Sequence, residues 1–188
     1  MELIVATNNE VNALHLKFKK FNVHLLEDPS ELYDFIGIMD VFNRALNEEE
    51  ASELLGRSHN RKHSAQFVST FTNLFHVGEK EVYVQINKKA VGKDKLKYIL
   101  GCLNRKEANF FRKWFSNNRG ICKISDEEAL VFLTKLAVNE LYFADFFFPS
   151  LDTVIVGNYD LSFPVYAKKV TGFNKCKEVI EKNGLFIR

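Results

Sequence analysis

The sequence contains little proline and little glycine, three and nine residues among 188. Because 46% of the residues are hydrophobic, this composition excludes a disordered or low-complexity chain. No apolar run approaches the roughly 20 residues that a membrane span needs, so we expect no membrane contact. A chain of this length can bury a sizeable core, and we expect residues 1–188 to form a single globular domain.

Cysteine is also scarce, and its placement limits the chemistry that we expect. Cys102, Cys122 and Cys176 are odd in number and far apart, and no C-x-x-C pair occurs. This pattern predicts reduced thiols, with neither a disulfide framework nor a cysteine zinc site. A basic leader is missing as well, because acidic Glu2 and Glu10 stand near the start. We therefore expect a cytoplasmic protein without cofactor or metal.

Charge is unevenly distributed, although the net charge is only +2. Residues 57–123 carry 15 Lys/Arg and 4 Asp/Glu, whereas residues 1–56 carry 4 and 11. A clustered positive field attracts polyanions and speeds their encounter with a protein. The alternative is that the acidic first third packs beside the basic middle and neutralises it.

The pattern of apolar and turn residues predicts an α+β (or α/β) fold with a β-α-β-like start. We expect strands at 1–6 and 22–26 around a helix at 11–21, and a further helix from Ser30 through Tyr33. From residue 57 we expect a solvated, β-containing segment with a strand at 81–86, and then a central helical hairpin from 93 to 116. A long helix should follow from 127 to about Phe146 or Pro149. The end of the chain predicts a β-hairpin of 153–156 and 161–167 and a short helix at 175–182.

The helical hairpin carries the best signals for a binding surface. Asn104-Arg105-Lys106-Glu107 has the N-x-x-E form of a capping box, and Gly101 stands where a C-cap is expected. In the helix that follows, one face is apolar and the other carries Arg105, Asn109, Arg112 and Lys113. Cations on one helix face suit a phosphate backbone, and Asn109 suits a base edge.

Neighbouring residues extend this predicted nucleic-acid surface. The added cations are Lys93, Lys95, Lys97, Arg57, Arg61 and Lys62. Aromatic residues interleaved with them, which also suit single-stranded partners, are Tyr83, Tyr98, Phe110 and Trp114. We therefore expect a non-catalytic protein that binds nucleic acid or another polyanion. An ordinary amphipathic hairpin, with its rings in the core and its charges in water, is the structural alternative.

A protein-interaction module, such as an inhibitor or an immunity-type protein, is the competing functional class. Its signals are the acidic first third and the consecutive rings Phe146, Phe147 and Phe148, which we expect to form an exposed anchor patch.

An enzyme is the third class, and one resemblance points to it. Thr7, Asn8 and Asn9, which follow the first expected strand, resemble the opening turn of the inosine triphosphate pyrophosphatase family. In that family a lysine and a glutamate on the next helix help to bind the triphosphate. Asn12 and His15 stand at those places in this sequence, so the charges are missing. The family's acidic Asp-Ser-Gly motif has no convincing counterpart either.

Two histidines in the basic run raise further possibilities. His59 and His63 are four residues apart, and a zinc site would need His76 or Cys102 to complete it. Arg57 and His63 also resemble, loosely, the arginine–histidine motif of HEPN ribonucleases.

A third pattern matches the spacing of restriction-type nucleases, in which carboxylates hold Mg²⁺ and a lysine activates water. Asp152 and Lys168 have that spacing, but Tyr166 occupies the place of the second acid. We therefore interpret Lys168 as the charged end of a strand.

Overall fold

All strands that the computed structural model describes belong to one sheet. The structure describes residues 1–18, 32–86, 91–117 and 120–188. The strand order is β1-β4-β3-β5-β6-β7-β2-β8, and every neighbouring pair is antiparallel. The strands are β1 (Ile4–Val5), β2 (Phe35–Asp40), β3 (Val82–Ile86), β4 (Gly120–Ile124), β5 (Asp145–Phe148), β6 (Thr153–Val156), β7 (Phe163–Ala167) and β8 (Phe186–Ile187). The predicted α+β class is confirmed, and the parallel α/β alternative is wrong.

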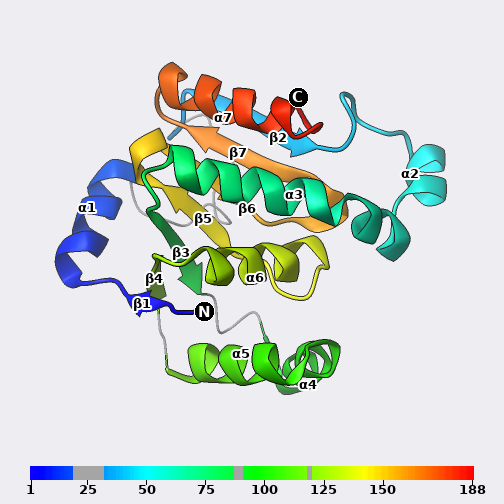
Figure 1. The fold of residues 1–188 in the computed structure, drawn as a ribbon. Coiled ribbons are helices and arrows are strands. Elements are labelled where there is room, and N and C mark those ends of the chain that lie inside the picture. The colour runs from blue at the N-terminus through cyan, green and yellow to red at the C-terminus, as the bar shows by residue number, and fades with distance from the viewer. Residues whose placement is uncertain (19–31, 87–90, 118–119) are drawn as a thin grey trace.

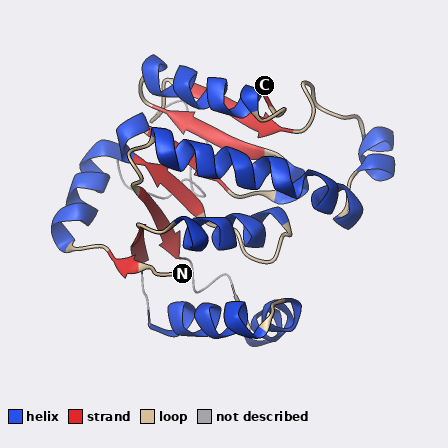
Figure 2. Cartoon of the chain, viewed as in Figure 1, coloured by secondary structure: helices blue, strands red, loops and turns tan. Residues whose placement is uncertain are grey.

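Helices cover the sheet and extend beyond it (Figures 1 and 2). They are α1 (Asn8–Phe18), α2 (Glu48–Leu54), α3 (Arg57–Val77), α4 (Lys93–Cys102), α5 (Arg105–Asn117), α6 (Glu127–Val138) and α7 (Val170–Lys182), with short 3-10 turns η4 (Pro149–Leu151) and η5 (Tyr159–Leu161). None of the described helices combines the length and the apolar character that crossing a membrane requires.

The main core lies on one face of the sheet, which α3, α6 and α7 cover (Figure 1). On α3, Phe67, Phe71 and Leu74 are fully buried. A smaller apolar cluster lies on the opposite face, where Leu14 and Phe18 of α1 pack. The α4–α5 hairpin lies at the bottom of the view in Figure 1, and its Ile99, Phe111 and Trp114 belong to the main core.

The structure corrects our prediction for the segment that begins at residue 57. Residues 57–77 form one helix of 21 residues that we did not predict, whereas the strand expected at 81–86 is confirmed as β3. The reason is the spacing of Phe67, Phe71, Leu74 and Phe75, which places all four side chains on one helical face. The basic side chains before them obscured this period.

The predicted N-terminal elements are only partly right. β1 and α1 occur, and the next described strand, β2, lies at the seventh position of the sheet, so it is not a neighbour of β1. The expected strand at 22–26 lies outside the described residues. The helix expected beyond Tyr33 is wrong, because β2 begins at Phe35. A Cβ on Gly37 would lie 2.8 Å from Ile187, so this strand needs glycine to pass the C-terminal segment.

The long helix predicted from residue 127 is also shorter than expected. α6 ends at Val138, and β5 occupies residues 145–148. Phe146, Phe147 and Phe148 have no exposed surface, because β5 is an interior strand with buried side chains on both faces. The predicted anchor patch of three phenylalanines is therefore wrong. A short apolar run has no period that separates a buried strand from a buried helix.

Local predictions succeeded better elsewhere. The central helical hairpin is present as α4 and α5, and the C-terminal hairpin is present as β6 and β7. The terminal helix is present as α7.

The turn at Thr7 is a helix cap. The Glu10 carboxylate accepts hydrogen bonds from the backbone N–H and the hydroxyl of Thr7, both at 2.8 Å, and the Glu10 N–H donates to the Thr7 hydroxyl at 3.3 Å. This is a capping box, and the T-x-x-E spacing is the signal for it in the sequence. Glu10 also accepts from the Tyr83 hydroxyl at 3.0 Å, which ties α1 to β3.

These contacts predict a pH dependence of folding. Hydrogen bonds from Thr7, then from Tyr83, lower the pKa of Glu10 from 4.5 to about 2. Because the folded pKa is depressed, Glu10 stabilises the fold above pH 4.5 and loses this contribution as pH falls toward 2. We expect Glu10→Gln to lower the unfolding temperature at pH 7. The unfolding temperature of this variant should also fall less than that of the parent when the pH is lowered from 4.5 to 2, as thermal melts would measure.

The matched control is Glu53→Gln on α2, since Glu53 is exposed and has no hydrogen-bond or ion-pair partner among the described residues. A Glu10→Gln protein with the same pH profile as the parent would contradict this role of Glu10.

Candidate nucleic-acid interface

The α4–α5 hairpin is joined by a two-residue turn and a capping box. The Asn104 Oδ1 accepts from the Glu107 N–H at 3.0 Å, and the Glu107 carboxylate accepts from the Asn104 N–H at 3.2 Å. α4 continues through Gly101, and Leu103 is its C-cap, so the expected glycine C-cap is wrong. The capping box sets the direction in which α5 leaves the turn.

α5 has one buried face and one exposed face. Phe111 is fully buried and Trp114 is 2% exposed; the Trp114 ring meets the Tyr142 ring at a centroid distance of 5.5 Å. On the opposite face Arg105, Asn109, Arg112 and Lys113 are exposed. The core contacts therefore fix the position of α5, and its polar residues face the solvent.

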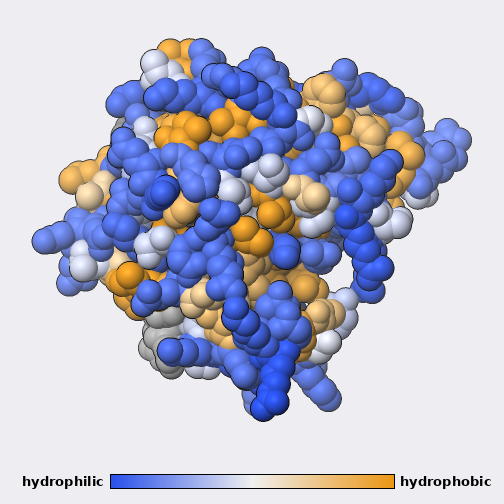
Figure 3. All heavy atoms as spheres, in the orientation of Figure 1, coloured by the Kyte–Doolittle hydropathy of each residue, from blue (hydrophilic) through white to orange (hydrophobic). Residues whose placement is uncertain are grey.

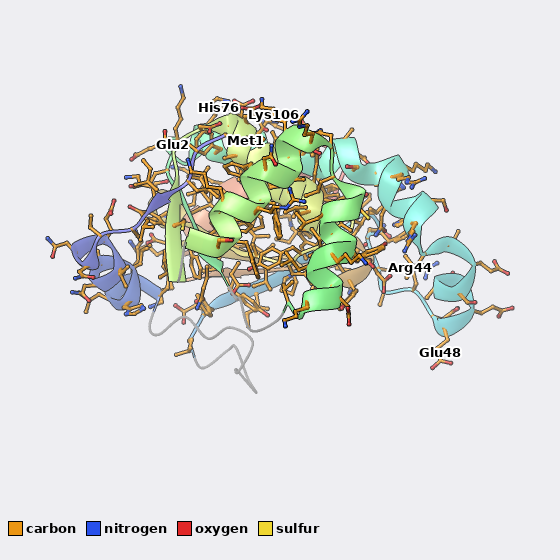
Figure 4. The ribbon with its side chains drawn as sticks, turned by 90° about the horizontal axis from the view of Figure 1, so that it is seen from below. Met1, Glu2, Arg44, Glu48, His76 and Lys106 are labelled. Atoms are coloured by element: carbon orange, nitrogen blue, oxygen red, sulfur yellow. The ribbon has the colours of Figure 1, made fainter. Side chains whose placement is uncertain are left out.

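Exposed ion pairs join the first turn of α6 to Lys106 of α5 and to Met1. The Lys106 ammonium lies 2.5 Å from the Glu128 carboxylate, and the Met1 ammonium lies 2.7 Å from the same carboxylate. These cations, Lys106 first, lower the pKa of Glu128 from 4.5 to about 2. The Glu2 N–H donates to Asp126, the N-cap of α6. Figure 4 shows Met1, Glu2 and Lys106 at one end of the hairpin.

A shallow groove runs between α4 and α5. Its volume is about 400 Å³, and its walls are Lys93, Leu96, Lys97, Leu100, Gly101 and Arg112. The structure thus brings three predicted cations from two helices to one groove. Arg112 also donates to the Asn109 Oδ1 at 3.4 Å, a long hydrogen bond.

The start of α3 joins this surface. The Arg57 guanidinium donates to the Tyr98 hydroxyl of α4 at 2.8 Å. Arg57 and Arg61 line a cavity of about 440 Å³ between the start of α3, the α4–α5 turn and the end of α6. Figure 3 shows a hollow in this region, at the lower right.

The remaining predicted residues lie outside both hollows. Lys62, Lys95, Arg105 and Lys113 are exposed but line neither the groove nor the cavity. The structure therefore divides the predicted residues between a groove, a cavity and the open surface around them.

The nine predicted cations have in common that no acidic side chain pairs with them among the described residues. Over the described ranges 1–18, 32–86, 91–117 and 120–188, none of these nine cations has a carboxylate within 4.0 Å: Arg57, Arg61, Lys62, Lys93, Lys95, Lys97, Arg105, Arg112 and Lys113. By contrast, Lys17 and Lys169 pair with Asp152, and Lys123 pairs with Glu10 and Glu81. In the part of the chain that is described, the acidic first third therefore forms no ion pair with these nine cations.

The aromatic residues predicted for stacking are mostly in the core. Tyr83 is 4% exposed and Trp114 is 2% exposed, whereas Tyr98 is 49% exposed. Phe110 is half-buried, with its ring centroid 5.4 Å from that of Phe132. Of the four rings, Tyr98 alone is open to a base.

The residues proposed for metal chemistry have other contacts. The His59 and His63 rings share a face of α3, with centroids 4.7 Å apart, and His59 stacks on Phe42. Burial lowers the pKa of His59 and favours the neutral ring. Among the described residues, no three His, Cys, Asp or Glu side chains are placed to share a metal ion. Asp152, the expected Mg²⁺ ligand, forms ion pairs with Lys17 at 2.8 Å and Lys169 at 3.0 Å.

Sequence reasoning did not find the other residues of the cavity. Asn60, Lys135, Asn139 and Glu140 line it together with Arg57 and Arg61. They come from α3 and from the end of α6, so no local spacing could have grouped them. Comparison of the chain with protein-family models, curated proteins and solved structures finds no match.

The two faces of α5 predict opposite effects of substitution. Replacing Trp114 by Ala removes a buried ring, so we expect a loss of about 3–5 kcal/mol of folding stability in denaturant titrations. Replacing Arg105, Arg112 and Lys113 by Gln retains helix propensity and leaves that core intact. An unfolding midpoint in the triple variant as low as that of Trp114→Ala would show that these residues support the fold.

Proposed function

We propose that the protein binds nucleic acid through the α4–α5 hairpin and the adjoining start of α3. The observation that carries this proposal is the set of nine exposed cations without carboxylate partners among the described residues, gathered on three adjoining helices. Unpaired cations attract a polyanion and release its counterions on binding.

The spacing on α5 suits a phosphate backbone. Arg105 and Arg112 are seven residues apart, which is about 10.5 Å along a helix axis and about three base-pair steps of duplex DNA. Lys113 follows directly, and Lys93 and Lys97 of α4 face Arg112 across the groove. Because most candidate rings are buried, phosphate contact explains this surface better than base stacking.

The other functional classes have less support in the structure. The protein-interaction class no longer has its anchor patch, and its remaining signal is the exposed acidic side chains Glu48, Glu49 and Glu53 of α2. For the pyrophosphatase resemblance, Thr7 serves as a helix cap. The ribonuclease resemblance rests on Arg57 and His63, which are six residues apart on α3. Their side chains therefore point about 120° apart around the helix axis, and do not share one face.

The proposal predicts salt-dependent binding that depends on α5. We expect a generic DNA duplex to bind at low salt and to dissociate as salt rises, with the logarithm of affinity linear in the logarithm of salt concentration. The variant Arg105→Gln, Arg112→Gln, Lys113→Gln should reduce that slope by about one unit for each phosphate that is no longer neutralised. Fluorescence anisotropy at several salt concentrations measures both quantities.

The matched control places the same loss of charge on another helix. Lys175, Lys177 and Lys182 are exposed on α7, which lies at the opposite end of the molecule from α4 and α5 (Figure 1). Their triple Gln variant should lower affinity far less than the α5 variant. Equal weakening of affinity in the two variants would indicate a response to net charge alone and would contradict a hairpin interface.

The binding proposal also predicts the absence of turnover. We expect inosine triphosphate, RNA and DNA to remain intact when incubated with the protein and Mg²⁺ or Zn²⁺, as chromatography and gels would record. Metal-dependent cleavage that disappears in Thr7→Ala, His63→Ala or Asp152→Ala would instead support an enzyme.

A further inference from the structure

Helix α2 stands away from the sheet and from the helices that cover it (Figure 1). None of its seven residues is buried, and none lines the groove or the cavity. Local contacts hold it: the Glu50 N–H donates to the Asn47 Oδ1 at 2.9 Å, and the Arg44 guanidinium lies 2.5 Å from the Glu50 carboxylate. A helix this short is marginal in water without packing, so a partner that covers α2 would stabilise it.

The exposed surface of α2 is acidic and carries one large apolar side chain. Glu48, Glu49 and Glu53 are exposed, and none has a hydrogen-bond or ion-pair partner among the described residues. Figure 4 shows Glu48 at the outer edge of the molecule. Leu54 is 48% exposed, and it lies about 100° around the helix axis from Glu53. This surface therefore favours a partner that has cations beside an apolar strip.

The groove between α4 and α5 has that chemistry. It is lined by Lys93, Leu96, Lys97, Leu100, Gly101 and Arg112. None of these side chains is acidic, and Asp94, the acidic residue of α4, is exposed outside the groove. A phosphate backbone would contact the cations and leave the two leucines in water. An acidic helix with an apolar side chain would cover both.

The spacing of the charges matches between the two helices. The lysine pair, Lys93 and Lys97, is four residues apart on α4, and the glutamate pair, Glu49 and Glu53, is four residues apart on α2. Each pair spans about 6 Å along its helix axis, so two helices side by side can align both carboxylates with both ammonium groups. α2 is about 10.5 Å long and α4 about 15 Å, so α2 fits along the groove.

The chain does not make this contact with itself. No residue of α2 lines the groove, and among the described residues no carboxylate pairs with the lysine pair. In Figure 4 the hairpin faces the viewer and α2 stands to one side of it. A second copy can present its open groove to α2 without any rearrangement of either copy.

We propose that α2 of one copy docks in the α4–α5 groove of a second copy, with the glutamate pair against the lysine pair and Leu54 against the two leucines. The contact joins two different surfaces, so it is heterologous. A short helix covers little area, and the association is therefore weak and reversible. Self-association does not require nucleic acid, but α2 and a phosphate backbone would compete for the groove of the proposed interface.

Sedimentation velocity of the full chain tests the association. At low salt we expect the sedimentation coefficient to rise with protein concentration up to about 1 mM, and the rise to disappear at about 0.5 M salt, where short-range screening is strong. A sedimentation coefficient independent of concentration at low salt would overturn the proposal, and α2 would then remain free or fold onto its own groove.

Charge reversal of either pair should abolish the association. Glu49→Lys with Glu53→Lys should raise the dissociation constant at least about tenfold, because like charges would then face each other. Lys93→Glu with Lys97→Glu should do the same, although it changes the net charge only from +2 to −2 and so does not increase repulsion between copies. The matched control is Glu178→Lys with Glu181→Lys on α7, where both side chains are exposed; it should weaken association far less.

Combining the two reversals gives the sharpest result. The variant that carries all four substitutions again has opposite charges on α2 and in the groove, and it has the net charge of the parent. We expect it to self-associate with a dissociation constant within about threefold of that of the parent. The two pair variants mixed in equal amounts should associate as well. Thermal melts check that each variant is folded, and folded variants that fail to associate in both experiments would overturn the proposal.

Nucleic-acid binding distinguishes this inference from the proposed function. The Glu49→Lys, Glu53→Lys variant should bind duplex DNA at least as tightly as the parent, because its groove is intact and no longer covered. If no variant binds DNA while the concentration dependence persists, the hairpin interface is wrong and the self-association stands. If DNA binds and the sedimentation coefficient does not depend on concentration, the self-association is wrong and the interface stands.

Discussion

The packing of α3 across the sheet is the constraint on which the rest of the structure depends. The Phe71 ring lies 4.7 Å from Phe146 and 6.3 Å from Phe163 between centroids, and Phe67 lies 5.1 Å from Phe163. These contacts join β5 and β7 to one helix and hold α6 and α7 beside it. Burial of large aromatic rings at near-crystalline density leaves few alternative positions for α3. The buried C-terminal part of α3 consequently fixes the position of the basic N-terminal part of the same helix.

The α4–α5 hairpin depends on the same core through its own buried side chains. Phe111 and Trp114 insert into the apolar cluster that α6 and Tyr142 share with the sheet. The Lys106–Glu128 pair is exposed and contributes little by itself, but it lies where α5 meets the first turn of α6. The hairpin is therefore held from its apolar side, and its cations face water. A basic surface on a rigid support is the arrangement that phosphate contact requires.

Local signals predict the elements that local interactions form, and they fail where tertiary burial decides. The N-x-x-E box at Asn104 acts within one turn and is predicted from spacing alone. The helix predicted over residues 145–148 is wrong, because four apolar side chains in a row satisfy a buried strand as well as a buried helix. The Thr7 capping box is as local as that of Asn104. Its T-x-x-E spacing could have predicted it in the same way, although we did not make that prediction.

The sequence by itself determined which residues are available for binding: the cations of 57–113 and the helical period that sets Arg105, Arg112 and Lys113 opposite Trp114. These properties follow from composition and from a repeat of 3.6 residues, which need no distant partner. Only the tertiary structure decided which of them meet. Arg57 and Tyr98 are 41 residues apart, and Asn60 and Glu140 are 80 apart. Their contacts exist because the aromatic core places α3 against α6, and no spacing along the chain encodes that placement.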